Sequence, residues 1–137
     1  MVRALSVLLL FGGILSADEV ADRKMINAAI GSLFVPQVRS DPKRLAELTT
    51  TDFDGDLSSI PVHTIWCETS CAGFKVRSLK FVTNDVAAVD GDVTMGHVWL
   101  SEWLMILKRD GPAWRISSIH PIASSPLARA NRQGPTK

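Results

Sequence analysis

The sequence has few of the features that mark specialised classes of protein. Its 137 residues include only two cysteines, too few for a disulfide-built miniprotein or a four-cysteine zinc site. Fifteen Lys and Arg residues against fourteen Asp and Glu residues give a net charge of +1. This balance excludes the strongly basic surface that nucleic-acid binding needs, so we expect no nucleic acid as a partner.

Several catalytic and cofactor motifs are also missing. The chain contains no Gly-x-Ser-x-Gly elbow, no phosphate-binding loop and no dinucleotide fingerprint. We therefore expect neither Ser-His-Asp catalysis nor any cofactor. What is present, 46% hydrophobic and 21% charged residues, is typical of one compact globular domain that needs no metal for its stability.

The only long apolar run stands at the N-terminus. It covers residues 4–15, follows Arg3 and precedes Ser16, Ala17 and the polar Asp18. This order predicts a signal peptide over 1–17 and export to the periplasm or the medium, and the run is too short to span a bilayer comfortably. An uncleaved anchor or a buried helix is the alternative. No other segment approaches the length of a membrane span.

The mature chain, residues 18–123, is expected to begin with a helix over 18–35 that ends at Pro36. Its apolar stripe recurs at steps of three and four residues and consists of Ile26, Ile30, Leu33 and Phe34. Its wetter side is assigned to Asp22, Arg23 and Lys24.

A second, shorter helix is expected over 42–49. Asp41 is a capping residue and Pro42 suits the first helical position, while Leu45 and Leu48 would be buried. Residues 49–56 are then expected to form a loop or turn. For residues 60–72 the β-branched content favours a strand, but a helix that starts at Ser59 remains an alternative.

The second half of the chain predicts four strands, over 74–83, 86–93, 97–109 and 113–122. Turns are expected at residues 83–85 and at Asp110-Gly111. From residue 124 onwards the apolar content falls, so 124–137 is predicted to be a flexible tail. Helices first and an antiparallel sheet afterwards predict an α+β fold.

Three pieces of this pattern carry a family resemblance. They are the first helix, the phrase leading from Asp41-Pro42 through residue 48 to Asp52-Phe53, and the sheet segments 84–90 and 107–116. Over residues 18–122 the chain resembles the nuclear transport factor 2-like superfamily, which includes ketosteroid isomerase, SnoaL-like cyclases and many exported domains. The resemblance implies a cone-shaped, curved sheet closed by helices on one side, with a pocket and a dimer through the outer face of the sheet.

The chain also departs from this family. The stretch between Asp52 and Phe74 is short, and the chain has no tyrosine, so the tyrosine donor of the steroid isomerases has no counterpart. No catalytic aspartate can be aligned residue by residue. The resemblance offers only Asp52, an acidic residue after the second helix, as a secondary catalytic candidate.

A turn at Asp110-Gly111 predicts which side chains share a face, because successive residues of a strand alternate. It sets Leu107 opposite Trp114 and Ser101 opposite His120. The predicted inner face holds Trp99, Ser101, Trp103, Met105, Leu107, Trp114, Ile116, Ser118 and His120. The predicted outer face holds Leu100, Glu102, Leu104, Ile106, Lys108, Arg115, Ser117 and Ile119.

The outer face is too apolar for an ordinary solvent-exposed surface. Leu100, Leu104, Ile106 and Ile119 would lie close together, and an apolar patch of this kind usually marks an interface. We therefore expect a homodimer through this face, with cover by the C-terminal tail as the alternative.

The inner face supplies the candidate site. His120 is the best catalytic candidate, since imidazole exchanges a proton near neutral pH, although a structural histidine at a strand end would fit the same pattern. A pocket for a small apolar ligand would be lined by Trp99, Trp103, Trp114, Ser101 and Ser118, although the same residues also suit a core.

Two other groups of side chains are candidate sites. Cys67 and Cys71 are disulfide candidates if a turn brings them together, and His63 would join them as a metal ligand only on a helix. The aspartates of residues 52–56 lack the distal glutamate of a calcium loop. No metal is predicted.

These observations favour an exported domain that binds a small molecule or dimerises, without an assigned catalytic activity. The alternatives are an isomerase, cyclase or hydratase that uses His or carboxylate acid-base chemistry in a pocket, and a purely structural subunit.

Overall fold

The computed structural model describes residues 17–59, 72–96 and 98–124. Several expectations fall on residues outside these ranges. They are the predicted signal peptide up to residue 16, the strand or helix at 60–71 with His63, Cys67 and Cys71, the start of a strand at His97, and the tail beyond residue 124.

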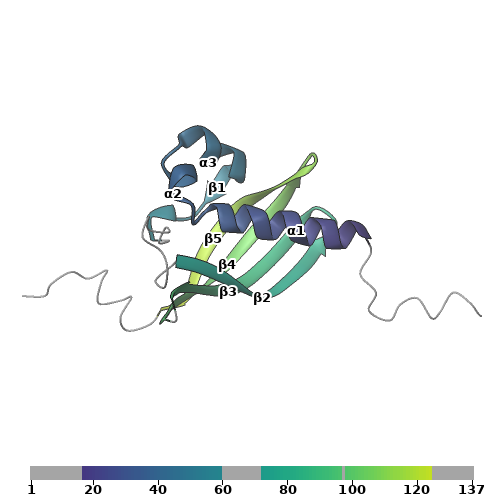
Figure 1. Cartoon of the computed structure of the whole chain (residues 1–137). Coiled ribbons are helices and arrows are strands. Elements are labelled where there is room, and N and C mark those ends of the chain that lie inside the picture. Colours follow the sequence, from purple (N-terminus) through teal and green to yellow (C-terminus); the bar gives the residue numbers. More distant parts are fainter. Residues whose placement is uncertain (1–16, 60–71, 97, 125–137) are drawn as a thin grey trace, which may run out of the picture.

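The fold is α+β, as expected, with helices followed by a mostly antiparallel five-stranded sheet (Figure 1). The helices are α1 (Ala17–Ser32), α2 (Pro36–Arg39) and α3 (Pro42–Leu48), and a 3-10 turn covers Leu57–Ser59. The strands are β1 (Thr49–Asp54), β2 (Ala72–Thr83), β3 (Val86–Met95), β4 (Val98–Asp110) and β5 (Ala113–Ser124). Their order in the sheet is β1-β5-β4-β3-β2.

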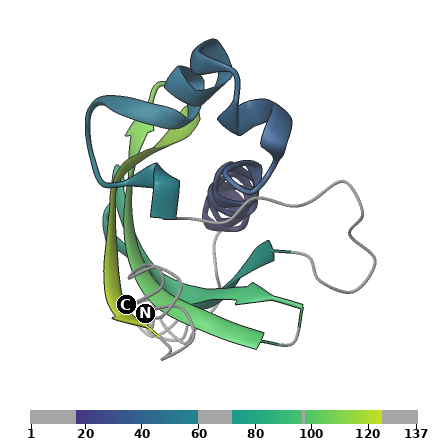
Figure 2. The same ribbon diagram turned by 90° about the vertical axis from the view of Figure 1, so that its left-hand side faces the viewer.

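The sheet curves around α1, as the view along the helix shows (Figure 2). We call the side of the sheet that faces α1 the inner face and the opposite side the outer face. The buried side chains of α1 include Ile26, Ala29 and Ile30, which recur at helical spacing and pack onto the inner face. Because this stripe is buried against the sheet, α1 lies over the inner face.

The expected helices are confirmed, with three differences in detail. Helix α1 ends at Ser32 instead of residue 35, and Pro36 begins α2, where proline suits the first helical position. Asp41 caps α3 as predicted and accepts a hydrogen bond from the Lys43 backbone nitrogen at 3.0 Å. Leu45 and Leu48 are only partly buried against the core. Asp22, assigned to the wetter side of α1, is buried.

The prediction of a loop over 49–56 is wrong, because residues 49–54 form β1. This strand pairs in parallel with β5, with Thr49 opposite Ile116 and Asp54 opposite Ser118. Three consecutive threonines favour an extended backbone since they are β-branched. The run of polar residues concealed this preference, because an edge strand needs no apolar alternation.

The four later strands are confirmed, but the predicted register of β4 and β5 is wrong by two residues. Asp110 pairs with Ala113, so the turn consists of Gly111 and Pro112, and Leu107 lies opposite Ile116 instead of Trp114. Gly111 has φ 60°, a conformation that glycine adopts without strain. A shift of two residues keeps each side chain on its face.

An extra residue in β5, Ser117, reverses the faces beyond it. The pairing passes from Leu107–Ile116 to Ile106–Ser118, which leaves Ser117 as a β-bulge. Ile119, predicted on the outer face, therefore enters the core with an exposure of 1%. Ser118 and His120, predicted on the inner face, lie on the outer face.

The inner face is closed by its own side chains. Trp103, Met105, Leu107 and Ile116 are buried there together with the stripe of α1. Phe74 packs so closely over Gly91 that a Cβ atom at residue 91 would lie 2.5 Å from its ring. Gly91 is therefore the residue that lets an aromatic ring cover β3.

Candidate functional site

The tryptophans expected in a ligand pocket do not share one environment. Trp103 is 1% exposed and donates its indole N–H to the Ser101 hydroxyl at 2.5 Å. Trp114 is also buried in the core. Trp99 is 37% exposed and donates to Asp92 Oδ1 at 2.8 Å, on the outer side of the sheet. Two of the three rings are thus packing residues, and the third lies at the surface.

The two acid-base candidates lie on the outer side as well. The His120 side chain is 51% exposed, and its Nε2 is 3.9 Å from Asp54 Oδ2. Asp52 is largely exposed and lies 3.8 Å from the Lys108 ammonium group. His120 therefore does not sit beside Trp103 and Ser101, and the inner-face site that the sequence predicted is not assembled from these residues.

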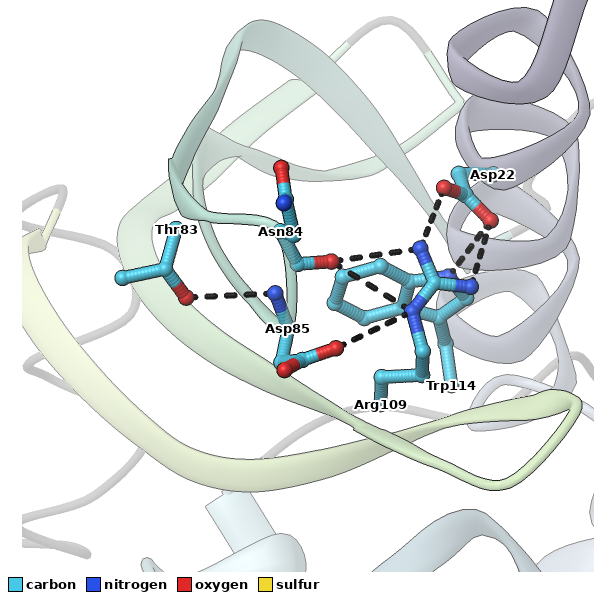
Figure 3. Close-up of polar contacts among 6 residues, drawn as sticks. All are labelled: Asp22, Thr83, Asn84, Asp85, Arg109 and Trp114. Atoms are coloured by element: carbon cyan, nitrogen blue, oxygen red, sulfur yellow. Dashed lines mark hydrogen bonds and ion pairs between the residues drawn. The ribbon is translucent and has the colours of Figure 1, made fainter.

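The best-built polar cluster joins α1 to the β4–β5 hairpin (Figure 3). Arg109 grips the Asp22 carboxylate with both terminal nitrogens, at 3.0 and 2.5 Å. The indole N–H of Trp114 donates to the same carboxylate at 3.0 Å. The Arg109 guanidinium also lies 4.7 Å from the centre of the Trp114 ring. This fork-shaped pairing fixes the helix against the sheet.

The turn between β2 and β3 completes the cluster. Arg109 Nε donates to the Asn84 carbonyl at 3.3 Å and lies 3.4 Å from an Asp85 carboxylate oxygen. The Arg109 backbone nitrogen donates to the Asp85 carbonyl at 2.8 Å. One arginine therefore ties together a helix and two hairpins.

The cluster changes the proton affinity of Asp22. The hydrogen bonds from Arg109 and Trp114 lower the pKa of this carboxyl against the opposing effect of burial. The same bond from Asp22 raises the pKa of Arg109. Both groups are therefore charged at neutral pH and hold each other in place.

A cavity of about 350 Å³ opens beside this cluster. Its lining includes Asp18, Glu19 and Asp22 from α1, together with Phe81, Asn84 and Arg109. The donors of Arg109 are already engaged with Asp22 and Asn84, so the arrangement suits a structural clasp better than a reacting centre.

Sequence reasoning missed this clasp, although one signal was present. Asp22 lies four residues before Ile26 and eight before Ile30, so it continues the apolar stripe of α1. A carboxylate on a buried stripe needs a partner. The partner could not be found from the sequence, because Arg109 is 87 residues away.

The outer face carries charge at both ends and apolar residues between them. Its centre consists of Ala88, Leu104 and Ile106, whose side chains are half-buried. The basic end, toward the β4–β5 turn, consists of Lys108 and Arg115, while Lys80 lies opposite Ala88 beside the apolar centre. The acidic end, further from that turn, holds the carboxylates Asp90, Asp92 and Glu102 together with two cations, Lys75 and Arg77. Leu100, expected on this face, packs partly against the core.

Comparison with protein-family models, curated proteins and solved structures finds no match to this chain. Within residues 17–59, 72–96 and 98–124, no helix is long and apolar enough to cross a membrane. The same residues contain no group of three or more His, Cys, Asp or Glu side chains arranged to hold a metal ion. The order of its elements defines the chain as a curved α+β domain.

Proposed function

We propose that this chain is an exported, noncatalytic domain that associates with a second copy of itself through the outer face of its sheet. The observation that carries the proposal is the half-buried apolar centre formed by Ala88, Leu104 and Ile106, which lies on the side of the sheet turned away from α1 (Figure 2). Removing such a centre from water is favourable by about 25 cal/mol per Å² of apolar surface.

The charges of the outer face favour one arrangement of the two copies. A two-fold axis parallel to the strands would stack Lys108 on Lys108 of the second copy. An axis that lies in the interface perpendicular to the strands instead places the basic end of each copy over the acidic end of the other. It also places Leu104 over Ile106 of the second copy. Apolar residues then meet apolar residues, and basic residues meet acidic ones, in the same arrangement.

One unsatisfied group supports this arrangement. Asp90 Oδ1 is buried and makes no hydrogen bond among the described residues. In contrast, Asp92 and Glu102 share the Arg77 guanidinium, at 2.6 and 3.0 Å. Lys80 has no ion pair among the described residues and would reach Asp90 of the second copy in the proposed arrangement. Buried carboxylates are stabilised by such partners.

The other functions weighed from the sequence receive less support. An apolar ligand on the inner face would need the space that Trp103 and Trp114 fill. Isomerase, cyclase or hydratase chemistry at His120 would have to occur at an exposed position on the outer face. Self-association requires neither an empty inner face nor a buried histidine, because it uses the outer face of the sheet.

Light scattering at micromolar concentration tests the proposal. The wild-type chain is expected to have the mass of a dimer, and Leu104→Glu is expected to have the mass of a monomer because it places an unpaired charge in the interface. Met25→Glu is the matched control, since Met25 is an exposed apolar residue of α1. A monomeric wild-type chain, or equal dissociation by both variants, would contradict the proposal.

A further inference from the structure

Two cations face each other at the basic end of the outer face. Lys108 of β4 and Arg115 of β5 are directly opposite in the antiparallel register. Like charges in this position destabilise a sheet. A pair of like charges that disfavours folding needs a compensating partner. Residues that break a local rule of stability in this way are concentrated at functional sites.

A cavity of about 250 Å³ lies beside this pair, where β1 begins. Its wall includes the three threonines 49–51 together with Lys108 and Arg115. Arg109 and the acidic Asp110 also line the cavity. The Arg109 guanidinium is engaged with Asp22, and the Asp110 carboxylate lies beside Arg115. The cavity thus collects hydroxyl and cationic donors from three strands that are adjacent in the sheet.

The acidic residues nearby compensate these cations only in part. Asp52 Oδ2 is 3.8 Å from the Lys108 nitrogen, and both side chains are largely exposed. Asp110 Oδ2 is 2.9 Å from the buried Arg115 Nε, which makes no hydrogen bond of normal geometry, and Arg115 Nη1 donates to the Ala46 carbonyl at 3.0 Å. Arg115 Nη2 is then the terminal nitrogen for which no described partner is found. The Lys108–Asp52 pair is exposed, and exposed pairs contribute little and exchange readily with other ions.

The Thr50 hydroxyl of the cavity wall is buried and makes no hydrogen bond of normal geometry among the described residues. It interacts with the Asp52 carboxylate closely enough to lower the pKa of that carboxyl. Thr49, in contrast, donates to the Leu45 carbonyl at 3.0 Å. An acceptor with several oxygens, placed between the strands, would satisfy donors that the chain leaves open.

We propose that this cavity binds a tetrahedral oxyanion, phosphate or sulfate, either free or as a monoester. Its oxygens would accept from Lys108 and Arg115 and would offset the repulsion between them, with Thr50 supplying a hydroxyl. Arginine matches such an anion through its planar array of donors, and lysine supplies a point charge. The contacts lie within one copy, so the proposal does not depend on self-association.

Inorganic phosphate, sulfate and glycerol phosphate are the probes, titrated at pH 7.5 and constant ionic strength while ¹H–¹⁵N NMR spectra are recorded. Saturable shifts are expected for residues 49–51, Lys108 and Arg115. Tighter binding of glycerol phosphate than of phosphate would identify an esterified ligand, and the reverse would identify the free anion. Shifts that rise linearly without saturation for all three probes would overturn the proposal.

Matched variants locate the site. Lys108→Gln and Arg115→Gln are each expected to weaken binding at least tenfold, which is about 1.4 kcal/mol. Lys24→Gln removes the same charge from an exposed residue of α1, outside both the cavity and the outer face, and is expected to leave binding unchanged. Equal weakening by all three variants would show a general charge effect and overturn the site.

The same titration on Leu104→Glu separates this proposal from self-association, because Lys108 also faces the second copy in the proposed pair. Binding by both chains, or stronger binding by the variant, supports the site whatever the oligomeric state. Binding by the wild-type chain alone would overturn a site contained in one copy.

Discussion

The inner and outer faces of the sheet treat polar groups in opposite ways. On the inner face, the buried Asp22 receives three hydrogen bonds, and the Ser101 hydroxyl accepts one from Trp103. On the outer face, Asp90 keeps a buried oxygen that no described group satisfies, and the buried Thr50 hydroxyl has only the Asp52 carboxylate beside it. On the inner side, Arg23 Nε is the one buried side-chain nitrogen of the described residues without a hydrogen-bond partner, although Arg23 Nη1 donates to the Leu79 carbonyl. A buried polar group costs free energy until it is paired, so the outer face leaves the larger cost.

This difference separates the parts of the molecule that maintain the fold from those that are available for binding. The inner face combines an apolar core with a single clasp, Asp22 with Arg109 and Trp114. The outer face combines a small apolar centre with charged residues beside it and at its two ends, of which Asp90 and Lys80 make no ion pair among the described residues. Substitutions on the inner face should therefore change folding, whereas those on the outer face should change association or ligand binding.

Trp103→Ala is the strongest test of this division. Loss of a fully buried tryptophan is expected to cost about 3–5 kcal/mol in the free energy of unfolding. Trp99→Ala is the matched control, because Trp99 is largely outside the core and loses chiefly one hydrogen bond to Asp92. Urea unfolding at a fixed protein concentration measures both. Equal losses would show that the two tryptophans share one environment, as the sequence pattern had suggested.

The clasp should show a smaller effect that depends on pH. Asp22→Asn is expected to cost about 1–3 kcal/mol at pH 7, because Arg109 loses a charged acceptor. The folded-state pKa of Asp22 is lowered, so its contribution is present above the unfolded value of about 3.9 and is lost as the pH falls through the folded value. The difference in stability between wild type and variant should therefore shrink below pH 4.

Urea unfolding at pH 7, 5 and 3 measures this difference. Asp18→Asn is the control, since Asp18 is an exposed carboxylate one turn earlier on α1, and it is expected to show little change at any pH. A wild-type advantage that grows in acid would contradict the assignment of Asp22 as a stabilising carboxylate.

The sequence predicts the helices and the four antiparallel strands because their signals are local. The spacing of Ile26 and Ile30, the cap at Asp41 and the turn at residues 83–85 each depend on a few neighbouring residues. The fifth strand was missed because Thr49–Asp54 has no apolar alternation, and its place in the sheet depends on β5, which lies more than 60 residues later. Local patterns do not contain such a pairing.

The candidate site was harder to predict because its geometry depends on the hairpin register. The turn residues moved the β4–β5 pairs as far as Leu107–Ile116 by two positions, which left the faces unchanged. The extra residue Ser117 then exchanged the faces from Ser118 onwards, and a second irregularity follows between Trp103 and Glu102. Nothing in the local composition distinguishes Ser117 from Ser118. The assignment of His120 to the inner face was wrong for this reason. The clasp at Asp22 could not be predicted because it joins residues that are far apart in the chain.

The smallest predicted effect tests the bulge itself. The sequence pattern places His120 inside and Ile119 outside, and the structure reverses them. His120→Ala should change the free energy of unfolding by less than about 0.5 kcal/mol, because its side chain is half-exposed and its ion pair with Asp54 is long. Ile119→Ala, one residue earlier, should cost about 2–5 kcal/mol because it opens a cavity in the core. Urea unfolding of both variants at pH 7.5 and equal protein concentration decides between the two registers. If His120→Ala were the more damaging substitution, the strand would run without a bulge at Ser117, His120 would face the core, and the inner-face site would have to be reconsidered.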